Sequence, residues 1–323
     1  MSSPGPAPPT PSSPLRTNPS PQPETALNPP PAPDAAETDS GALPGEHWAN
    51  QPMPAEDDDA DSAYDDTASS TTSITDSILE YRTIHGRTYH SDRIWAVDFG
   101  DLHPQTDVVG FDISPTQTQW VPPNVYFEHD DMTQPWGYSD NSVDFVHMRY
   151  LFGAVSDWNA LFEQAYRVCK PGGWVESFET DALLISEDGT IAPNSPMDQW
   201  GKLFTQAGKK IGRSFLVISE DLQRKGLEAA GFKDLVQWDF KCPLTPWPRD
   251  PKLKEMGLIS WHSLQDDIEG MVLYMFTKVL GWSELETQVY LAYLRQQLKD
   301  LNVHAFFRLR CIYAQKPEDA PAS

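Results

Sequence analysis

The stretch SVDFVHMRYLFGAVSDWNALFEQAYRVCKPGGWVESF, residues 142–178, decides the fold class. Its apolar run at residues 143–148 predicts a buried strand, and residues 158–168 carry apolar side chains at the spacing of one helix face. The segment KPGG at residues 170–173 ends that helix, because glycine adopts the left-handed turn at low cost. Residues 173–178 then predict a second strand. The order strand, helix, glycine turn and strand indicates a parallel α/β sheet.

Further elements flank this unit on both sides. Upstream, residues 108–113 predict a buried strand and residues 126–128 a shorter one. Downstream, the apolar spacing predicts helices at residues 222–230, 256–279 and 283–298. It also predicts strands at residues 235–240 and 303–313. The long helices would cover one side of the sheet. We therefore predict one α/β domain over residues 78–318 with a helical cap at about 245–300.

The first 77 residues differ in composition from the rest of the chain. They hold 16 of the 30 prolines, and residues 1–80 contain 14 acidic residues against one basic residue. Such a segment has too little apolar surface to offset the entropy of ordering it. We therefore predict a disordered Pro/Ser/acidic tail over residues 1–77 and a short disordered end at 319–323. The tail is interpreted either as a segment that contacts regulatory proteins or is phosphorylated, or as a solubilising leader without a specific partner.

The charge and the cysteines argue against several classes of protein. A net charge of −23 and a pI near 4.5 argue against direct binding to nucleic acid, since contacts of Lys and Arg with phosphate dominate that affinity. No apolar run approaches the roughly 20 residues that cross a bilayer, and the N-terminus lacks the pattern of a secretory signal. The three cysteines are too far apart for a disulfide framework or a CxxC metal motif. These features predict a protein without a metal site in a reducing intracellular compartment, cytoplasmic or nuclear.

Four segments carry a resemblance to a known family. They are IWAVDF at residues 94–99, VGFDISP at 109–115, FEHDD at 127–131 and DFVHMR at 144–149. In this order they resemble the fungal LaeA-like and UMTA-like class I methyltransferases, and the resemblance covers roughly residues 80–317. It implies a Rossmann-like sheet, S-adenosylmethionine (SAM) as cofactor and a role in, or in the regulation of, fungal secondary metabolism. The implied methyl acceptor is a small molecule or a protein side chain.

The resemblance identifies four candidate site residues. It places Asp112 at the carboxyl end of a strand, where a carboxylate can accept hydrogen bonds from both ribose hydroxyls of the cofactor. Asp130 and Asp131 follow the next strand, in the loop that lies beside the adenine in the class I fold. His147 is a weak candidate for a general base, since histidine titrates near neutral pH. Each has a structural alternative, namely a strand-end acid that caps a turn, a solvated acidic turn and a packed histidine.

The glycine turn that holds the cofactor is missing from its expected place. In the resembling families a first strand and an acid-x-Gly-x-Gly-x-Gly run precede the segment that corresponds to residues 94–99. Glycine is needed there because a Cβ would fill the space that the ligand enters. Here residues 87–93 contain no glycine, and residues 81–90 resemble an entry segment that ordinarily lies several tens of residues earlier. We infer that an internal block containing a helix, the first strand and the glycine turn is absent.

This absence has consequences for the fold and for the function. The sheet is expected to be incomplete at its first strand, and SAM binding is expected to be impaired. Residues 94–101 are predicted to be helical, in a helix that begins near Ser91 or Asp92. The alternative is that they replace the missing central strand of the sheet. Two functions remain open, a SAM-dependent methyltransferase and a non-catalytic regulatory or scaffolding protein built on the same fold. The cap aromatics Trp261, Tyr274, Phe276 and Trp282 would line an acceptor pocket in the first case, or pack in a core.

Overall fold

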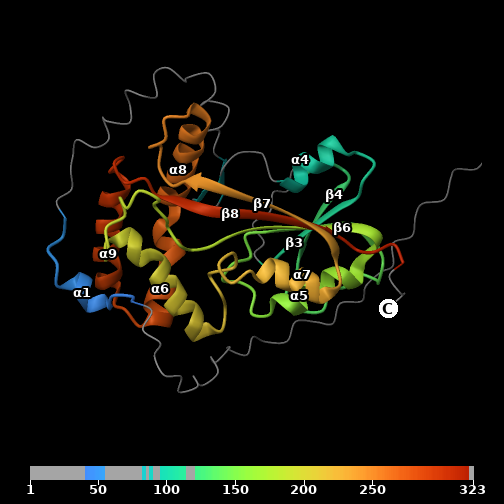
Figure 1. Cartoon of the computed structure of the whole chain (residues 1–323), viewed down its shortest axis with the longest axis horizontal. Helices are drawn as coiled ribbons and strands as arrows, with labels where there is room; N and C mark the ends of the chain where they lie inside the picture. Colours follow the sequence, from blue (N-terminus) through green and yellow to red (C-terminus); the bar gives the residue numbers. More distant parts are fainter. Residues whose placement is uncertain (1–40, 55–81, 85–86, 90–94, 114–120, 320–323) are drawn as a thin grey trace, which may run out of the picture. The chain divides into compact units, whose positions relative to one another are not determined.

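The computed structural model describes residues 41–54, 82–84, 87–89, 95–113 and 121–319 (Figure 1). The helices in these ranges are α1 (Gly45–Ala49), α4 (Trp95–Leu102), α5 (Trp158–Val168), α6 (Pro196–Ile211), α7 (Leu222–Ala230), α8 (Pro251–Tyr274), the π-helix η1 (Met275–Leu280) and α9 (Glu284–Leu298). The strands are β1 (Arg82–Ile84), β2 (Arg87–Tyr89), β3 (Val108–Asp112), β4 (Val125–His129), β5 (Val143–Arg149), β6 (Cys169–Thr180), β7 (Lys233–Pro243) and β8 (Phe306–Gln315).

The described strands form three separate sheets. Four of them pair in the order β5-β6-β8-β7, in which β5 and β6 are parallel and β8 is antiparallel to both of its neighbours. β3 and β4 form a parallel pair, and β1 and β2 an antiparallel hairpin. Among the described residues no strand pairs with both β3 and β5. Parallel strands predicted from the sequence are therefore present in two pieces, β3–β4 and β5–β6, and the larger piece is a mixed sheet.

Helix α4 packs on the smaller piece. Residues 95–102 are helical, which confirms the prediction for this segment and excludes its use as a central strand. Gly100 lies so close to β4 that an added Cβ would stand 2.2 Å from Cγ2 of Val125. The side-chain amide of Asn124 donates to the carbonyl of Gly100 at 3.1 Å and fixes the end of the helix. Ala96, Val108 and Val125 form the small core between α4 and the strand pair.

Helices α5 and α7 cover one face of the four-stranded sheet (Figure 1). The N-cap Asp157 accepts a hydrogen bond from the amide of Ala160, and the apolar face of α5 buries Phe162 completely. Strand β6 begins directly at the end of α5, so the predicted turn at residues 170–173 belongs to the irregular start of the strand. Only glycine fits there, because Gly172 has a φ of 78° and Gly173 has no room for a Cβ.

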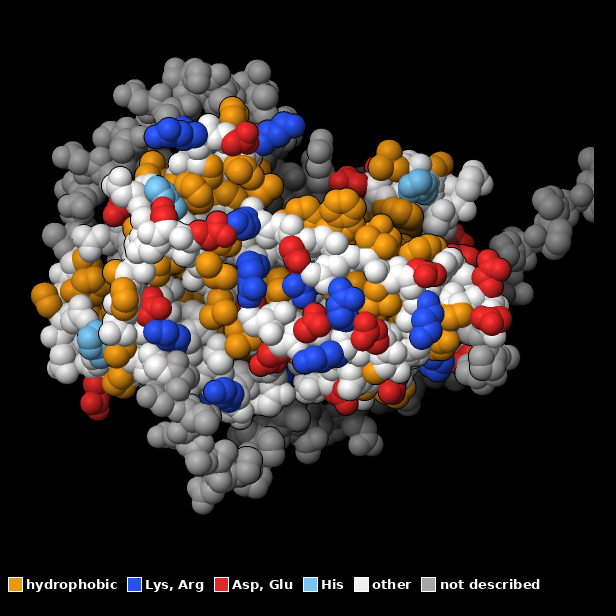
Figure 2. Space-filling view, viewed as in Figure 1, with side chains coloured by type: hydrophobic (Ala, Val, Ile, Leu, Met, Phe, Trp, Pro, Cys, Tyr) orange, Lys and Arg blue, Asp and Glu red, His pale blue; other side chains and the backbone are white. Residues whose placement is uncertain are grey.

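The opposite face of β7 leaves a row of apolar side chains exposed. Val236, Trp238 and Phe240 alternate along this edge strand, and Trp238 is 56% exposed. Their register partners on β8 include Cys311 and Tyr313. Figure 2 shows hydrophobic side chains gathered over β7 and β8. Among the described strands, β7 has only one neighbour, so its outer edge is not paired either.

A second core lies in the helical region. It unites α6, α8, η1 and α9, so the cap is larger than the predicted 245–300 and includes α6. Phe276 and Trp282 belong to this core, Trp261 packs against it, and Tyr274 is mostly exposed. The cap aromatics therefore serve mainly in packing. No helix in the described ranges is both long enough and apolar enough to span a membrane.

Helix α1 lies inside the segment that was predicted to be disordered. Its Trp48 is 2% exposed and meets the ring of Tyr290 edge-on, with ring centroids 5.0 Å apart. The amide of Leu43 donates to the side chain of Gln199 on α6, and the hydroxyl of Tyr293 donates to the carbonyl of Pro52. Residues 41–54 are thus docked on the cap, which corrects the prediction for this stretch. The rest of residues 1–77 lies outside the described residues.

Replacing Trp48 tests whether this docked segment contributes to stability. We expect Trp48→Ala to lower the free energy of unfolding by about 3 kcal/mol, because it empties a fully buried aromatic site. The control Met53→Ala changes a side chain that is 62% exposed in the same segment and should have an effect within about 0.5 kcal/mol. Urea denaturation measures both. Equal midpoints for the two variants would contradict the docking of α1.

Candidate functional site

The carboxyl edge of the β3–β4 pair brings the predicted carboxylates together. Asp112 is the last residue of β3 and stands opposite His129 of β4. The amide of Asp130 donates to the carbonyl of Asp112 at 3.2 Å, so the two residues are direct neighbours across the strand ends. Both side chains are exposed, and Asp131 is half-buried. Residues 114–120, with the predicted turn at Pro115, lie outside the described residues.

Asp131 is held in a local turn. Its carboxylate accepts hydrogen bonds from the hydroxyl of Thr133 at 2.7 Å and from the amide of the same residue at 2.9 Å. These bonds, together with the nearby charge of Arg213, hold the pKa of Asp131 below its ordinary value. The amide of Asp131 donates in turn to Asp130 Oδ1 at 2.9 Å. The edge therefore presents a fixed negative charge beside two exposed carboxylates.

His147 lies in the other sheet, on β5 opposite Glu176 of β6. Its Nδ1 is 2.9 Å from Glu176 Oε1, and this hydrogen bond is the main cause of a lowered pKa of Glu176. The indole of Trp95 on α4 stacks on the imidazole with ring centroids 3.9 Å apart and planes 10° from parallel. The Nε2 atom of His147 is buried and has no hydrogen-bond partner in the described part of the chain. These contacts favour the packed-histidine interpretation over a general base.

Whether SAM fits this chain depends on the residues that lie between β3 and β5. The carboxylates of Asp112, Asp130 and Asp131 suit the hydroxyls and the amine of a nucleoside. The aminoacid end of the cofactor would need backbone N–H groups in a glycine turn between β3 and β5. In the described ranges the rings of Trp95 and Phe99 from α4 contact β5 instead. Among the described residues, three carboxylates thus have the chemistry that a nucleoside needs, and no glycine turn stands between β3 and β5.

Two buried acids at the end of β6 were not singled out in the sequence. Glu179 is fully buried, and its carboxylate accepts the amide of Leu151 at 3.0 Å and that of Phe152 at 3.1 Å. Burial raises the pKa of Glu179 to about 8. Asp181 is also fully buried and accepts the amide of Ile218 at 2.8 Å and the hydroxyl of Ser219 at 2.7 Å. Each acid holds one of two loops at the carboxyl edge of the sheet.

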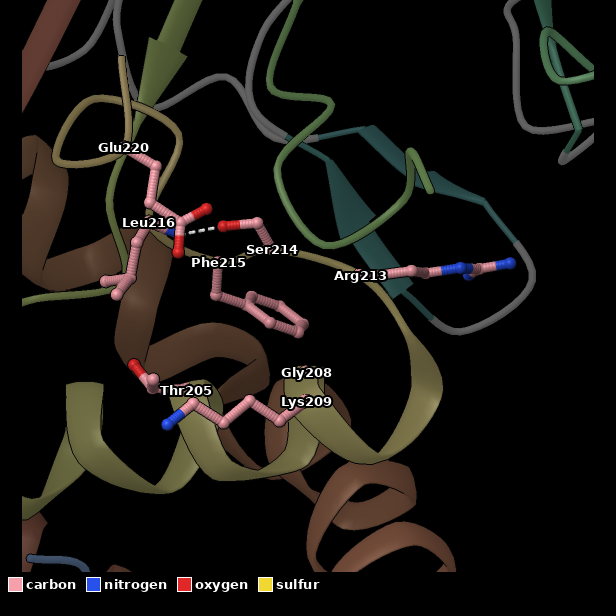
Figure 3. A pocket seen from close by; sticks show the side chains of 8 residues that line it. All are labelled: Thr205, Gly208, Lys209, Arg213, Ser214, Phe215, Leu216 and Glu220. Carbon is pink, nitrogen blue, oxygen red and sulfur yellow. Dashed lines mark hydrogen bonds between the residues drawn. The ribbon is translucent and has the colours of Figure 1, made fainter. Parts of the chain in front are cut away.

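A hollow lies between the segments that these acids hold. One part has a volume of about 200 Å³ and is lined by residues of α6 and of the segment after it, namely Thr205, Gly208, Lys209, Arg213, Ser214, Phe215, Leu216 and Glu220 (Figure 3). A second part of about 390 Å³ shares Ser214 and Glu220 with the first and reaches the start of α5 at Trp158. Neither part is lined by the four predicted site residues. Of the residues that line it, Arg213 also acts electrostatically on Asp131.

Comparison with known proteins settles the family. A profile described as "Methyltransferase domain" matches residues 92–237. The methyltransferase pytC of Aspergillus terreus is 32% identical over an alignment of 311 positions, which covers 80% of this chain and 95% of that protein. This chain belongs to the fungal methyltransferases. The secondary metabolism regulator LAE1 of Cochliobolus heterostrophus is 29% identical over 70% of this chain and 74% of its own length.

This result confirms the predicted LaeA-like methyltransferase resemblance and the α/β methyltransferase fold. The family uses SAM, and its fungal members include both enzymes and regulators of secondary metabolism by name. The alignment with pytC runs over 311 residues although it takes up only 80% of this 323-residue chain. The relative therefore carries several tens of positions without a counterpart here.

Replacing Trp95 tests whether side chains alone join the two sheets. We expect Trp95→Ala to lower the free energy of unfolding by about 2 kcal/mol, because the stack on His147 and the contact with Phe99 are lost. Amide hydrogen exchange in β3 should accelerate more than exchange in β6. The control Leu102→Ala removes a side chain that is 76% exposed on the same helix, and it should be nearly neutral. A Trp95 variant as stable as this control would show that other contacts join the sheets.

Proposed function

We propose that this chain is a SAM-dependent methyltransferase of fungal secondary metabolism in which cofactor binding is weakened by the incomplete sheet. The cluster of Asp112, Asp130 and Asp131 at the carboxyl edge of β3–β4 carries the proposal, since parallel strands present nucleoside-binding acids at such an edge. In the proposed complex with SAM, Asp112 contacts the ribose, and Asp130 and Asp131 lie beside the adenine. His147 remains a weak catalytic candidate.

The acceptor site of the proposed enzyme is the hollow beside α6. The smaller part is lined by α6 and the segment after it, with Lys209 and Arg213 as cations and Phe215 as an aromatic surface. The larger part reaches the end of the loop after β5 at residues 155–157. Methyl transfer depends chiefly on holding donor and acceptor in line, so a shaped hollow at the correct edge is the main requirement. The acceptor class is a small polar metabolite or a protein side chain.

A second candidate is a non-catalytic regulatory or scaffolding protein. The observation that favours it is that no described strand joins β3 to β5, while the side chain of Trp95 on α4 stacks on His147 of β5. In this case the acidic segment at residues 1–77 contacts regulatory protein partners. Relatives that are named as regulators of secondary metabolism support a role of this kind.

Calorimetric titration with SAM separates the two candidates. For the chain as it stands we expect negligible heat at cofactor concentrations up to about millimolar, because half of the ligand has no backbone cradle. Binding in the micromolar range would contradict the impaired-cofactor proposal. The decisive control is a chain that carries an inserted helix, first strand and acid-x-Gly-x-Gly-x-Gly turn before Ile94. It should bind SAM, and Asp112→Asn in that background should weaken binding by tenfold or more, equivalent to about 1.4 kcal/mol.

Sequencing of the transcript gives an independent result. Reads across codons 85–95 that contain an intervening block with a glycine triplet would restore the enzyme in full. Reads that join these codons directly would leave the divided sheet as the native state of the protein. The two results lead to opposite expectations for methyltransferase activity in the organism.

A further inference from the structure

Glu179 and Asp181 form a matched pair of buried acids. Glu179 lies on β6 and Asp181 directly follows the end of that strand, and both side chains are fully buried. Glu179 accepts the backbone amides of Leu151 and Phe152 in the loop after β5. Asp181 accepts amides in the segment between α6 and α7. One strand end thus fixes both loops that border the hollow.

The loop that hydrogen-bonds to Glu179 also contacts residues that line the hollow. Next to the two anchored amides, the amide of Gly153 donates to the carbonyl of Ser214 at 2.8 Å. The ring of Phe152 meets that of Phe215 edge-on, with centroids 6.1 Å apart. A Cβ on Gly153 would stand 2.2 Å from the Phe215 ring, so the contact is tight. Movement of the loop after β5 must therefore displace Ser214 and Phe215, which line the hollow.

The loop after β5 has a backbone that needs such an anchor. Tyr150 has a φ of 54° and Gly153 a φ of 71°, both in the left-handed region. For a tyrosine this conformation is costly and persists only where surrounding contacts hold it. The amide of Tyr150 donates to the carbonyl of Phe178 at 3.0 Å, and the bonds to Glu179 follow immediately. Loss of these bonds would free a strained segment.

The two acids differ in how their charge is balanced. Asp181 forms an ion pair with Arg308 at 2.7 Å. Glu179 has no cation partner among the described residues, because its register partner Arg310 pairs with Asp221 and Asp239 instead. The guanidinium of Arg149 lies over the rings of Tyr150 and Phe178. The amides of Leu151 and Phe152 offset the charge of an ionised Glu179 only in part, so burial still favours the protonated form.

We propose that Glu179 is a positioning residue whose protonated form holds the loop after β5 against the hollow, and that loss of its proton releases the loop. The inference rests on the proposed function only in treating the hollow as the acceptor site. The release itself depends on the burial of the carboxyl and on its lack of a cation. It would make the shape of the hollow sensitive to pH near neutrality.

The direction of the effect follows from proton linkage. Burial raises the pKa of Glu179 from 4.5 to about 8, so the closed loop binds the proton more tightly than an open loop that admits water. The stabilisation of the closed loop is fully present below a pH of about 4.5 and is lost as the pH rises toward about 8.

Amide hydrogen exchange of the full-length chain tests the proposal. After correction for the intrinsic pH dependence of exchange, we expect residues 150–153 to open more readily as the pH rises from about 5 to about 8. At its steepest the change should approach tenfold per pH unit. In Glu179→Gln this slope should be absent. The matched control Glu176→Gln removes an acid from the opposite face of the same strand and should keep the wild-type slope.

Each result bears on the proposal. A flat wild-type profile overturns it without any variant, so the test stands even if Glu179→Gln fails to fold. A slope that persists in Glu179→Gln overturns it as well, because another group must then titrate. Helix α5 serves as an internal reference that should not respond to pH. The experiment contains no SAM, so a failure of the proposed cofactor site would leave its outcome unchanged.

Discussion

Backbone pairing between neighbouring strands is the constraint on which this structure depends. From β5 through β6 and β8 to β7 the ladder is continuous, and it carries the core that α5 and α7 cover. Between β3 and β5 the described residues supply no ladder, so the two pieces meet through side chains such as Trp95 on His147 and Phe111 near Trp136. The nucleoside-type acids and the hollow consequently belong to different pieces. Any function that needs both must rely on aromatic packing for its geometry.

Helices and strands that bury their apolar face against a partner in the same chain could be predicted from the sequence. The strands β3 and β5 and the helix α5 follow from apolar periodicity, because each buries its own face against a partner that is present. The helical state of residues 95–102 followed from the absence of a glycine turn and of room for a crossover helix. The break in the sheet was likewise predictable, since two motifs that belong far apart in the family adjoin each other.

Other features depend on long-range contacts that local patterns do not express. Helix α1 carries one decisive residue, Trp48, in a proline-rich and acidic surrounding, and its order comes from α9. Helix α6 did have a signal in the N-cap Ser195 and in apolar residues at helical spacing. The roles of Glu179 and Asp181 were hidden because acids are usually exposed. A signal was available for Glu179, because it falls on the same face of β6 as the buried residues Val175 and Ser177.

The exposed row on β7 affects how the protein behaves in solution. A tryptophan and two further apolar side chains on an unpaired edge form a natural template for contact between copies. The charge of −23 opposes such contact by mutual repulsion, which acts only over the Debye length. This length shrinks from about 10 Å at 0.1 M salt to about 3 Å at 1 M. Colloidal stability should therefore decline with ionic strength, the reverse of ordinary salting-in.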